Sequence, residues 1–166
     1  MQCVWGKVEG LMLGHDDGDP PLYSEILPNL WQGGTDDDDL VHKGSGRLPT
    51  TSDHKEFDVV VSLSAYSLPM GWMVKEYRYG FPDGPADDDV YAELERIADY
   101  AYLDWKAGKK VLVRCQAGLN RSGLMVALIL LRDRMKIDDA IALIRKKRSA
   151  YALDNAHFVE YLKRKM

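Results

Sequence analysis

The sequence predicts an α/β protein in which helices flank both faces of a small, mostly parallel central sheet of about four or five strands. Short apolar runs rich in β-branched residues, Phe57–Leu63 and Val111–Val113, are typical of strands buried on both faces. Segments with helical periodicity, 90–105 and 123–131, follow these strand candidates along the chain. Because a strand, a helix and a second strand in that order favour parallel pairing, these observations together indicate the fold class.

Local signals place the individual elements. Clusters of Gly, Pro and Asp separate the apolar runs, and residue types such as Asp138 and Asn155 commonly begin helices. We expect the strand at 57–63 to pair in parallel beside the strand at 111–114. In chain order, the sequence predicts a strand within 26–34 that stops at two glycines, a short helix over 35–40, an irregular loop over 42–54, strands over 57–63 and 76–81, a helix over 90–105 that stops near Gly108, a strand over 111–114, and helices over 123–131, over 138–148 and from 155 onward.

The length of 166 residues fits one domain with a core of its own. We assign residues 1–22 to an N-terminal extension packed on the domain, and residues 23–166 to the domain itself. The His- and Asp-containing turn at His15–Pro21 lacks the ligand spacing of a calcium loop. We therefore expect no metal site there.

Composition narrows the classes of partner. An apolar content of 46% and a charged content of 29% are ordinary for a globular protein, and a net charge of −4 argues against a DNA-binding face. We see no apolar stretch long enough to span a membrane and no signal peptide, so we expect no membrane partner. Cys3 and Cys115 have unrelated contexts, which argues against a disulfide framework and favours a cytoplasmic location.

The most informative stretch is the loop from Cys115 to Ser122, which lies between a predicted strand and a predicted helix. This order aims a row of backbone N–H groups at one point, where an anion can bind against the cysteine sulfur. Only a thiolate is a good nucleophile, and a helix N-terminus stabilises it by at most about 2 kcal/mol. The rest of the stabilisation that a thiolate needs at neutral pH must come from the loop amides, the Ser122 hydroxyl and the Arg121 guanidinium. The guanidinium can also bind phosphate through two parallel hydrogen bonds. We expect Gly118 to adopt a conformation that a β-carbon would oppose.

This loop resembles the Cys-x5-Arg-Ser/Thr loop of the cysteine-dependent protein tyrosine phosphatases, and the size of the chain resembles their dual-specificity branch. The resemblance implies a tyrosine-phosphatase-like fold and a catalytic domain over residues 23–166. It makes Cys115 the nucleophile of a phosphocysteine intermediate, with Arg121 holding the phosphoryl oxygens and Ser122 assisting departure of the thiolate. The phosphate-binding residues are then Gln116, Ala117, Gly118, Leu119, Asn120 and Arg121.

The same resemblance implies a general acid on a loop upstream of the cysteine, and Asp83 in Gly80–Pro85 fits that place. A loop rich in Pro and Gly can close over a substrate. Asp87, Asp88 and Asp89 are the rivals, but they stand where the next helix begins, and helix capping explains them without chemistry.

Two positions depart from the family pattern. Arg114 stands where the family usually has His, so one support of the thiolate is changed. An asparagine before the arginine, here Asn120, makes the loop similar to that of RNA 5′-triphosphatases and of some phosphoinositide phosphatases. An RNA 5′ end and a phosphoinositide therefore stay open as substrates. A rhodanese-like sulfurtransferase and an inactive phosphate-binding module are alternatives of another class.

The expected activity is hydrolysis of phosphomonoesters in a phosphorylated protein or peptide, chiefly phosphotyrosine, with phosphoserine and phosphothreonine allowed. A phosphate or sulfate ion is expected in the loop, with no metal and no cofactor, because amides and a guanidinium can supply the charge stabilisation. The basic run Arg145–Arg148 is explained by a solvated helix end. The alternative is that it borders the pocket and attracts phosphorylated partners.

Overall fold

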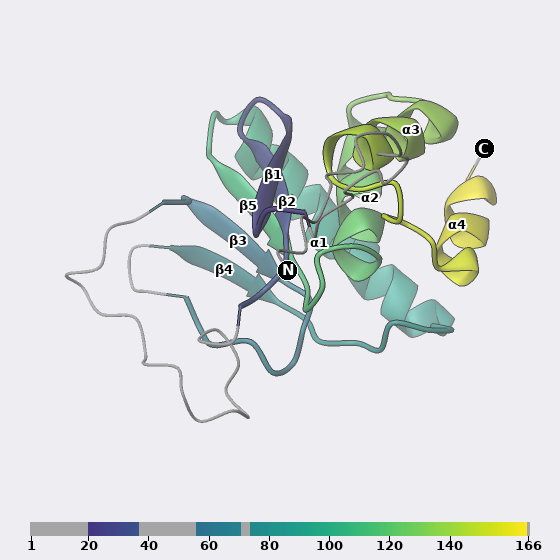
Figure 1. Ribbon diagram of the computed structural model, residues 1–166, viewed down its shortest axis with the longest axis horizontal. Coiled ribbons are helices and arrows are strands. Elements are labelled where there is room, and N and C mark those ends of the chain that lie inside the picture. The colour runs from purple at the N-terminus through teal and green to yellow at the C-terminus, as the bar shows by residue number, and fades with distance from the viewer. Residues whose placement is uncertain (1–19, 37–55, 71–73, 166) are drawn as a thin grey trace, which may run out of the picture.

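The computed structural model describes residues 20–36, 56–70 and 74–165, which form a mixed five-stranded sheet with four helices (Figure 1). The predicted α/β class with a mostly parallel sheet is confirmed. The predicted extension 1–22, the helix over 35–40 and the loop over 42–54 fall wholly or mainly outside the described residues and stay predictions. The elements are β1 (Tyr23–Leu27), β2 (Leu30–Gly33), β3 (Val59–Ser62), β4 (Lys75–Arg78), α1 (Asp88–Lys106), β5 (Val111–Arg114), α2 (Arg121–Arg132), α3 (Ile137–Lys147) and α4 (Ala156–Lys163).

The sheet has the strand order β1-β2-β5-β3-β4, so β5 is central, and all four of its residues are buried. β5 runs parallel to both β2 and β3, with Val113 opposite Gln32 and Val61, which confirms the predicted pairing of β3 with β5. The strand predicted within 26–34, which stops at two glycines, is β2, and it pairs antiparallel with β1, a strand that the sequence did not predict. The turn between the strands holds Asn29 at φ 65°, a conformation that asparagine tolerates better than most residues.

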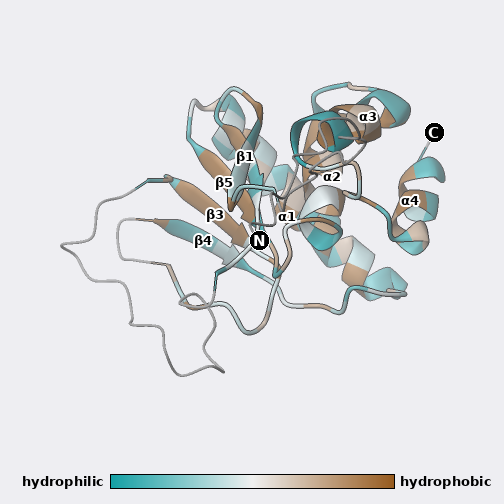
Figure 2. Ribbon diagram, viewed as in Figure 1, coloured by the Kyte–Doolittle hydropathy of each residue, from teal (hydrophilic) through white to brown (hydrophobic). Residues whose placement is uncertain are grey.

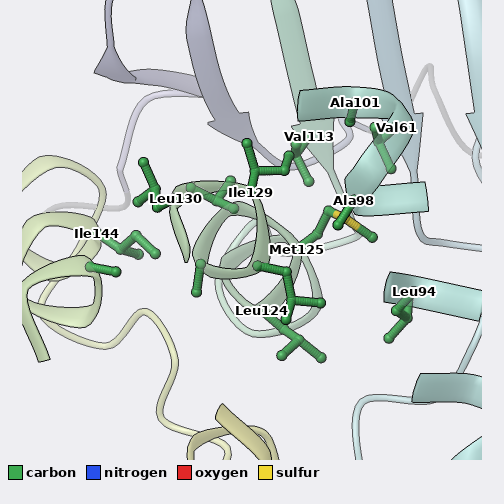
Figure 3. Packing of buried hydrophobic residues seen from close by; sticks show 14 of the residues in the cluster. Val61, Leu94, Ala98, Ala101, Val113, Leu124, Met125, Ile129, Leu130 and Ile144 are labelled. Atoms are coloured by element: carbon green, nitrogen blue, oxygen red, sulfur yellow. The ribbon is translucent and has the colours of Figure 1, made fainter. Parts of the chain in front are cut away.

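α1, α2 and α3 pack on one face of the sheet and α4 packs on α2, and together they form one continuous apolar core with that face (Figures 1 and 2). α2 lies at the centre of this layer, in contact with α1, α3, α4 and the sheet, which is why nearly all of its side chains are apolar and buried. Figure 3 shows Met125 of α2 beside Ala98 of α1, and Ile129 of α2 beside Val113 of β5.

The opposite face of the sheet carries a smaller apolar cluster, formed by Phe57, Val60 and Leu112. In the part of the chain that the structure describes, no helix covers this cluster. The expectation of helices on both faces is therefore not met within the described ranges.

The helix ends follow local chemistry. Asp87 precedes α1, and its carboxylate accepts a hydrogen bond from the Val90 amide at 3.0 Å. Asn155 caps α4 in the same way through the His157 amide, as predicted. α3 begins at Ile137, so Asp138 lies in its first turn rather than at the cap as predicted.

Because β2, β3, β4 and β5 are mutually parallel, their carboxyl ends meet at one edge of the sheet. The loops that follow these strands carry Gly34, Ser64, Gly80 and Cys115. Open α/β sheets bind ligands at this edge, so the fold brings the predicted catalytic segments together.

Candidate active site

The Cys115 loop connects the end of β5 to the start of α2 and is held against the end of β2. The Cys115 amide donates to the Gly33 carbonyl at 3.2 Å, and the side chain is 2% exposed. Gly118 has φ +72°, and a β-carbon there would lie 2.4 Å from the Gly33 carbonyl carbon. Position 118 therefore requires glycine for two reasons. The positive φ is the conformation expected from the sequence, and the close approach of Gly33 leaves no space for a side chain.

Arg121 is the first residue of α2, and its side chain reaches the ends of the other strands. Nη1 donates to the carbonyl oxygens of Phe81 at 3.0 Å and Leu63 at 3.4 Å. Nε is buried and has no hydrogen-bond partner among the described residues. A buried N–H of a cation is costly when unpaired, so an anion in the loop is the natural partner for this edge of the guanidinium.

Ser122 lies beneath the loop in the first turn of α2 and is fully buried. Its Oγ is 3.4 Å from Sγ of Cys115. It also accepts a hydrogen bond at 3.2 Å from Nε2 of Gln32, a residue of β2 that is itself fully buried. Cys115, Ser122 and Gln32 thus form a continuous polar chain beneath the candidate anion site.

Asp83 lies at the open side of the site, where it contacts the Cys115 loop directly. Oδ2 accepts from Nδ2 of Asn120 at 3.0 Å, and Oδ1 accepts from Nδ2 of Asn155 at 2.8 Å. The Oδ1 atom of Asn120 in turn accepts from the backbone amides of Asp154 and Asn155 at 2.9 and 3.1 Å. The side chain of Asn120 therefore ties the Asp83 loop to the segment before α4, while its backbone remains part of the loop.

The rival carboxylates lie elsewhere. Asp87 is occupied as the cap of α1, and Asp88 and Asp89 are exposed in the first turn of that helix. This matches the capping interpretation given to them from the sequence.

The basic run at the end of α3 divides into two kinds of residue. Arg148 is buried behind the loop, where Nε donates to the Gly118 carbonyl at 3.0 Å and Nη1 donates to Ser24 at 3.0 Å. Burial lowers the pKa of the Arg148 guanidinium, and attraction to Cys115 partly opposes that effect. Arg145 bonds to the carbonyls of Ala152 and Leu153, whereas Lys146 and Lys147 are exposed.

Arg114, which replaces the usual histidine, is directed to other partners. It is 1% exposed, and it donates through Nε to Ser62 at 3.0 Å and through Nη2 to the Leu68 carbonyl at 2.7 Å. Glu76 lies 3.6 Å from the same guanidinium. These contacts make Arg114 a link between β5, β3 and the loop after β3.

Within the described ranges, no group of three or more His, Cys, Asp or Glu side chains is arranged to hold a metal ion. The helices described there are also too short or too polar to cross a membrane.

The sequence matches the family model for the dual specificity phosphatase catalytic domain over residues 42–165. The chain belongs to this family. It is 31% identical over 111 residues to the putative tyrosine phosphatase 123R of Invertebrate iridescent virus 6, covering 64% of this chain and 72% of the viral protein. It is 51% identical over 72 residues to the human protein tyrosine phosphatase type IVA 3, covering 40% of this chain and 41% of that protein.

Solved structures of the family share the fold. A mouse putative dual specificity phosphatase complexed with zinc tungstate has a TM-score of 0.68 at 24% identity, covering 92% of this chain and 91% of that chain. Tk-PTP in the active form has a TM-score of 0.66 at 25% identity, covering 87% of this chain and 95% of that chain. The family assignment and these relatives identify the protein as a phosphatase of the tyrosine and dual-specificity type.

Sequence reasoning missed three residues that contact the site. Gln32 lies in a short predicted strand, where a polar residue among apolar ones is itself a signal of a special role. From the sequence, Arg148 is only part of a basic run, and Asn155 is only a helix start. No local pattern indicates that these two residues approach the Cys115 loop, because the contacts form only in the folded chain.

Proposed function

We propose that this phosphatase hydrolyses phosphate monoesters of phosphorylated proteins or peptides, chiefly phosphotyrosine, with phosphoserine and phosphothreonine as further substrates. The reaction proceeds through a phosphocysteine on Cys115. The observation that carries the proposal is the buried Nε of Arg121 at the start of α2, in the same loop as Cys115, which has no hydrogen-bond partner among the residues that the structure describes. The names of the relatives, which include a putative tyrosine phosphatase and dual specificity phosphatases, support this substrate class.

In the first step, the Cys115 thiolate attacks phosphorus, forming an S–P bond as the P–O bond to the leaving group breaks. Asp83 supplies a proton to the departing oxygen. The loop amides of residues 116–121 and the guanidinium of Arg121 bind the three equatorial oxygens, where negative charge must be stabilised.

In the second step, a water molecule attacks phosphorus and transfers a proton to the Asp83 carboxylate. The S–P bond breaks, and its electron pair returns to sulfur as a thiolate, to which the Ser122 hydroxyl donates a hydrogen bond. Inorganic phosphate leaves the loop. The 3.4 Å separation between Oγ of Ser122 and Sγ of Cys115 supports this role.

The contacts of Asn120 bear on the alternative substrates. RNA 5′ ends and phosphoinositides are the alternative substrates that Asn120 indicates, but its side chain is occupied by Asp83 and by two backbone amides. These contacts give Asn120 a positioning role within the protein. The phosphoprotein substrate therefore remains the first candidate.

A panel of substrates tests the proposal. Phosphotyrosine, phosphoserine and phosphothreonine peptides, phosphoinositides and triphosphate-ended RNA are compared for the wild type and for Cys115→Ser, with Cys3→Ser as the matched control. Phosphotyrosine peptide should be hydrolysed fastest, vanadate should inhibit, EDTA should have no effect, and Cys115→Ser alone should abolish turnover. Faster hydrolysis of RNA or lipid would overturn the substrate class. Retained activity in Cys115→Ser would overturn the mechanism, and cyanide consumption with thiosulfate but no phosphatase activity would indicate a sulfurtransferase.

A further inference from the structure

The amide of Gln32 is buried directly beneath the Cys115 loop. Nε2 lies 3.1 Å from the Gly118 carbonyl oxygen, 3.4 Å from that of Leu119 and 3.2 Å from Oγ of Ser122. Carbonyl oxygens can only accept hydrogen bonds, so the nitrogen of this amide, and not its oxygen, must face them. The surroundings thus fix the orientation of Gln32 as a donor toward Ser122.

This orientation determines where the Ser122 hydroxyl can donate its hydrogen. A serine within a helix commonly donates to the carbonyl four residues earlier, which here is Gly118. That carbonyl already accepts from Nε2 of Gln32 and, at 3.0 Å, from Nε of Arg148, and a carbonyl oxygen has two lone pairs. The Leu119 carbonyl, three residues before Ser122, accepts from the Leu153 amide at 3.3 Å and lies 3.4 Å from Nε2 of Gln32. Oγ of Ser122 also accepts from Gln32, and a thiolate at Cys115 has no hydrogen to donate, so the single hydroxyl hydrogen of Ser122 is left for Sγ, 3.4 Å away.

We propose that Gln32 is a positioning residue for the second chemical step. It directs the Ser122 hydroxyl toward Cys115 and so stabilises the thiolate that leaves when water breaks the S–P bond. This inference rests on the proposed function, because it assumes a phosphocysteine. Gln32 itself touches neither the substrate nor the reacting atoms.

The burial of Gln32 agrees with a functional role. Its Oε1 is buried and has no hydrogen-bond partner among the described residues. A buried acceptor in that state lowers stability, and an apolar side chain of similar size would avoid the loss. A glutamine at this position is therefore better explained by what its NH₂ group does than by stability.

The test compares Gln32→Met, which is nearly the same size but cannot donate, with Ser122→Ala and with the double variant. Ser62→Ala is the matched control, since Ser62 is fully buried on neighbouring β3 and bonds to Glu76 and Arg114. Rapid-quench and stopped-flow measurements with p-nitrophenyl phosphate give the rate of phosphocysteine breakdown and the fraction of phosphorylated enzyme in the steady state. Thermal unfolding of each variant reports on the fold.

Gln32→Met should slow phosphocysteine breakdown by about three- to tenfold and raise the phosphorylated fraction, with less change in its formation. Ser122→Ala should show the same pattern more strongly. In the Ser122→Ala background, Gln32→Met should change the rate of phosphocysteine breakdown less than twofold, because Gln32 acts through the serine. Ser62→Ala should leave the ratio of the two rates unchanged.

An unchanged breakdown rate in Gln32→Met, or an equal slowing in both backgrounds, would overturn the inference while leaving the proposed function intact. Failure of the wild type to form any phosphocysteine would instead overturn the proposed function. Gln32→Leu provides the same comparison if the methionine variant does not fold.

Discussion

The two sides of the Cys115 loop are held in opposite ways. On the inner side, Gln32 and Arg148 bond to the Gly118 carbonyl from β2 and from the end of α3, and both side chains are buried. On the outer side, Asp83 is exposed, and its contacts among the described residues are the side-chain amides of Asn120 and Asn155. Buried, multiply bonded groups are expensive to move, whereas exposed hydrogen bonds exchange readily with water.

This difference separates the two tasks of the proposed reaction. The inner side keeps the loop in one conformation, so its amides can bind an anion without reorganisation. The outer side holds a carboxylate that must exchange a proton in each step, and its partners can be released as the substrate enters. We therefore expect changes on the inner side to alter anion binding and the sulfur chemistry, and changes on the outer side to alter proton transfer.

The largest effect on the outer side should come from Asp83→Ala. Loss of the general acid should slow turnover of phosphotyrosine peptide by about 10²–10⁴-fold and leave the affinity for vanadate within a few fold, because the loop amides are untouched. The loss should be smaller with p-nitrophenyl phosphate, whose leaving group needs less protonation. Steady-state kinetics with both substrates measure the difference.

Asp87→Asn is the matched control for this prediction. Asparagine keeps the cap of α1 but removes the carboxylate. Turnover should remain near that of the wild type. If Asp87→Asn slows the reaction more than Asp83→Ala does, the general acid has been assigned to the wrong residue.

The same contrast explains which features of the site can be predicted from sequence. Cys115, Gly118, Arg121 and Ser122 lie in one short segment, so a strand, a loop and a helix in succession are enough to indicate an anion site. Their partners, such as Gln32 and Arg148, come from distant segments and depend on the packing of β2 and α3 against the loop. Local pattern carries no information about that packing.

The fold shows the same limit. The apolar runs of β3, β5 and α2 predict both element type and burial, because few alternatives bury such segments. The β1–β2 hairpin is harder to predict, since its strands mix polar and apolar residues and its turn holds Asn29 at positive φ. In α3, the sequence predicts Asp138 as the cap, but the helix begins one residue earlier, at Ile137. Ends of elements depend on tertiary contacts more than their centres do.

A smaller effect is expected when the Asp83 contacts are weakened without removing the carboxylate. Asn155→Ser keeps a helix cap for α4 but shortens the side chain that donates to Oδ1 of Asp83. We expect kcat for phosphotyrosine peptide to fall by about three- to tenfold, as suits the loss of one exposed hydrogen bond to a charged group. In an Asp83→Ala background, the same change should have almost no effect. Equal losses in both backgrounds would show that Asn155 acts through folding instead.

The smallest effect on activity should come from a polar cluster far from the loop, where Glu95 of α1 accepts from Arg132 of α2 at 2.7 Å and from Tyr161 of α4 at 2.5 Å. Burial tends to raise the pKa of Glu95, but hydrogen bonds from Lys165, Tyr161 and Arg132 lower it below the ordinary value. Glu95→Gln should lower the free energy of unfolding by about 1–2 kcal/mol and Tm by about 3–6 °C, while kcat stays unchanged.

The pH dependence of that loss identifies its cause. Since the pKa of Glu95 is lower in the folded state, its contribution is complete above the ordinary carboxyl pKa of about 4.3 and disappears as the pH falls through the folded value. The difference in unfolding free energy between the wild type and Glu95→Gln should therefore have its maximum value at about pH 6–8 and shrink below about pH 4.5. Chemical denaturation across this range measures it. A difference in unfolding free energy that does not change with pH would mean that the cluster stabilises the helices by packing rather than by charge. A change in kcat would mean that α4 transmits strain to Asn155 and the Asp83 loop.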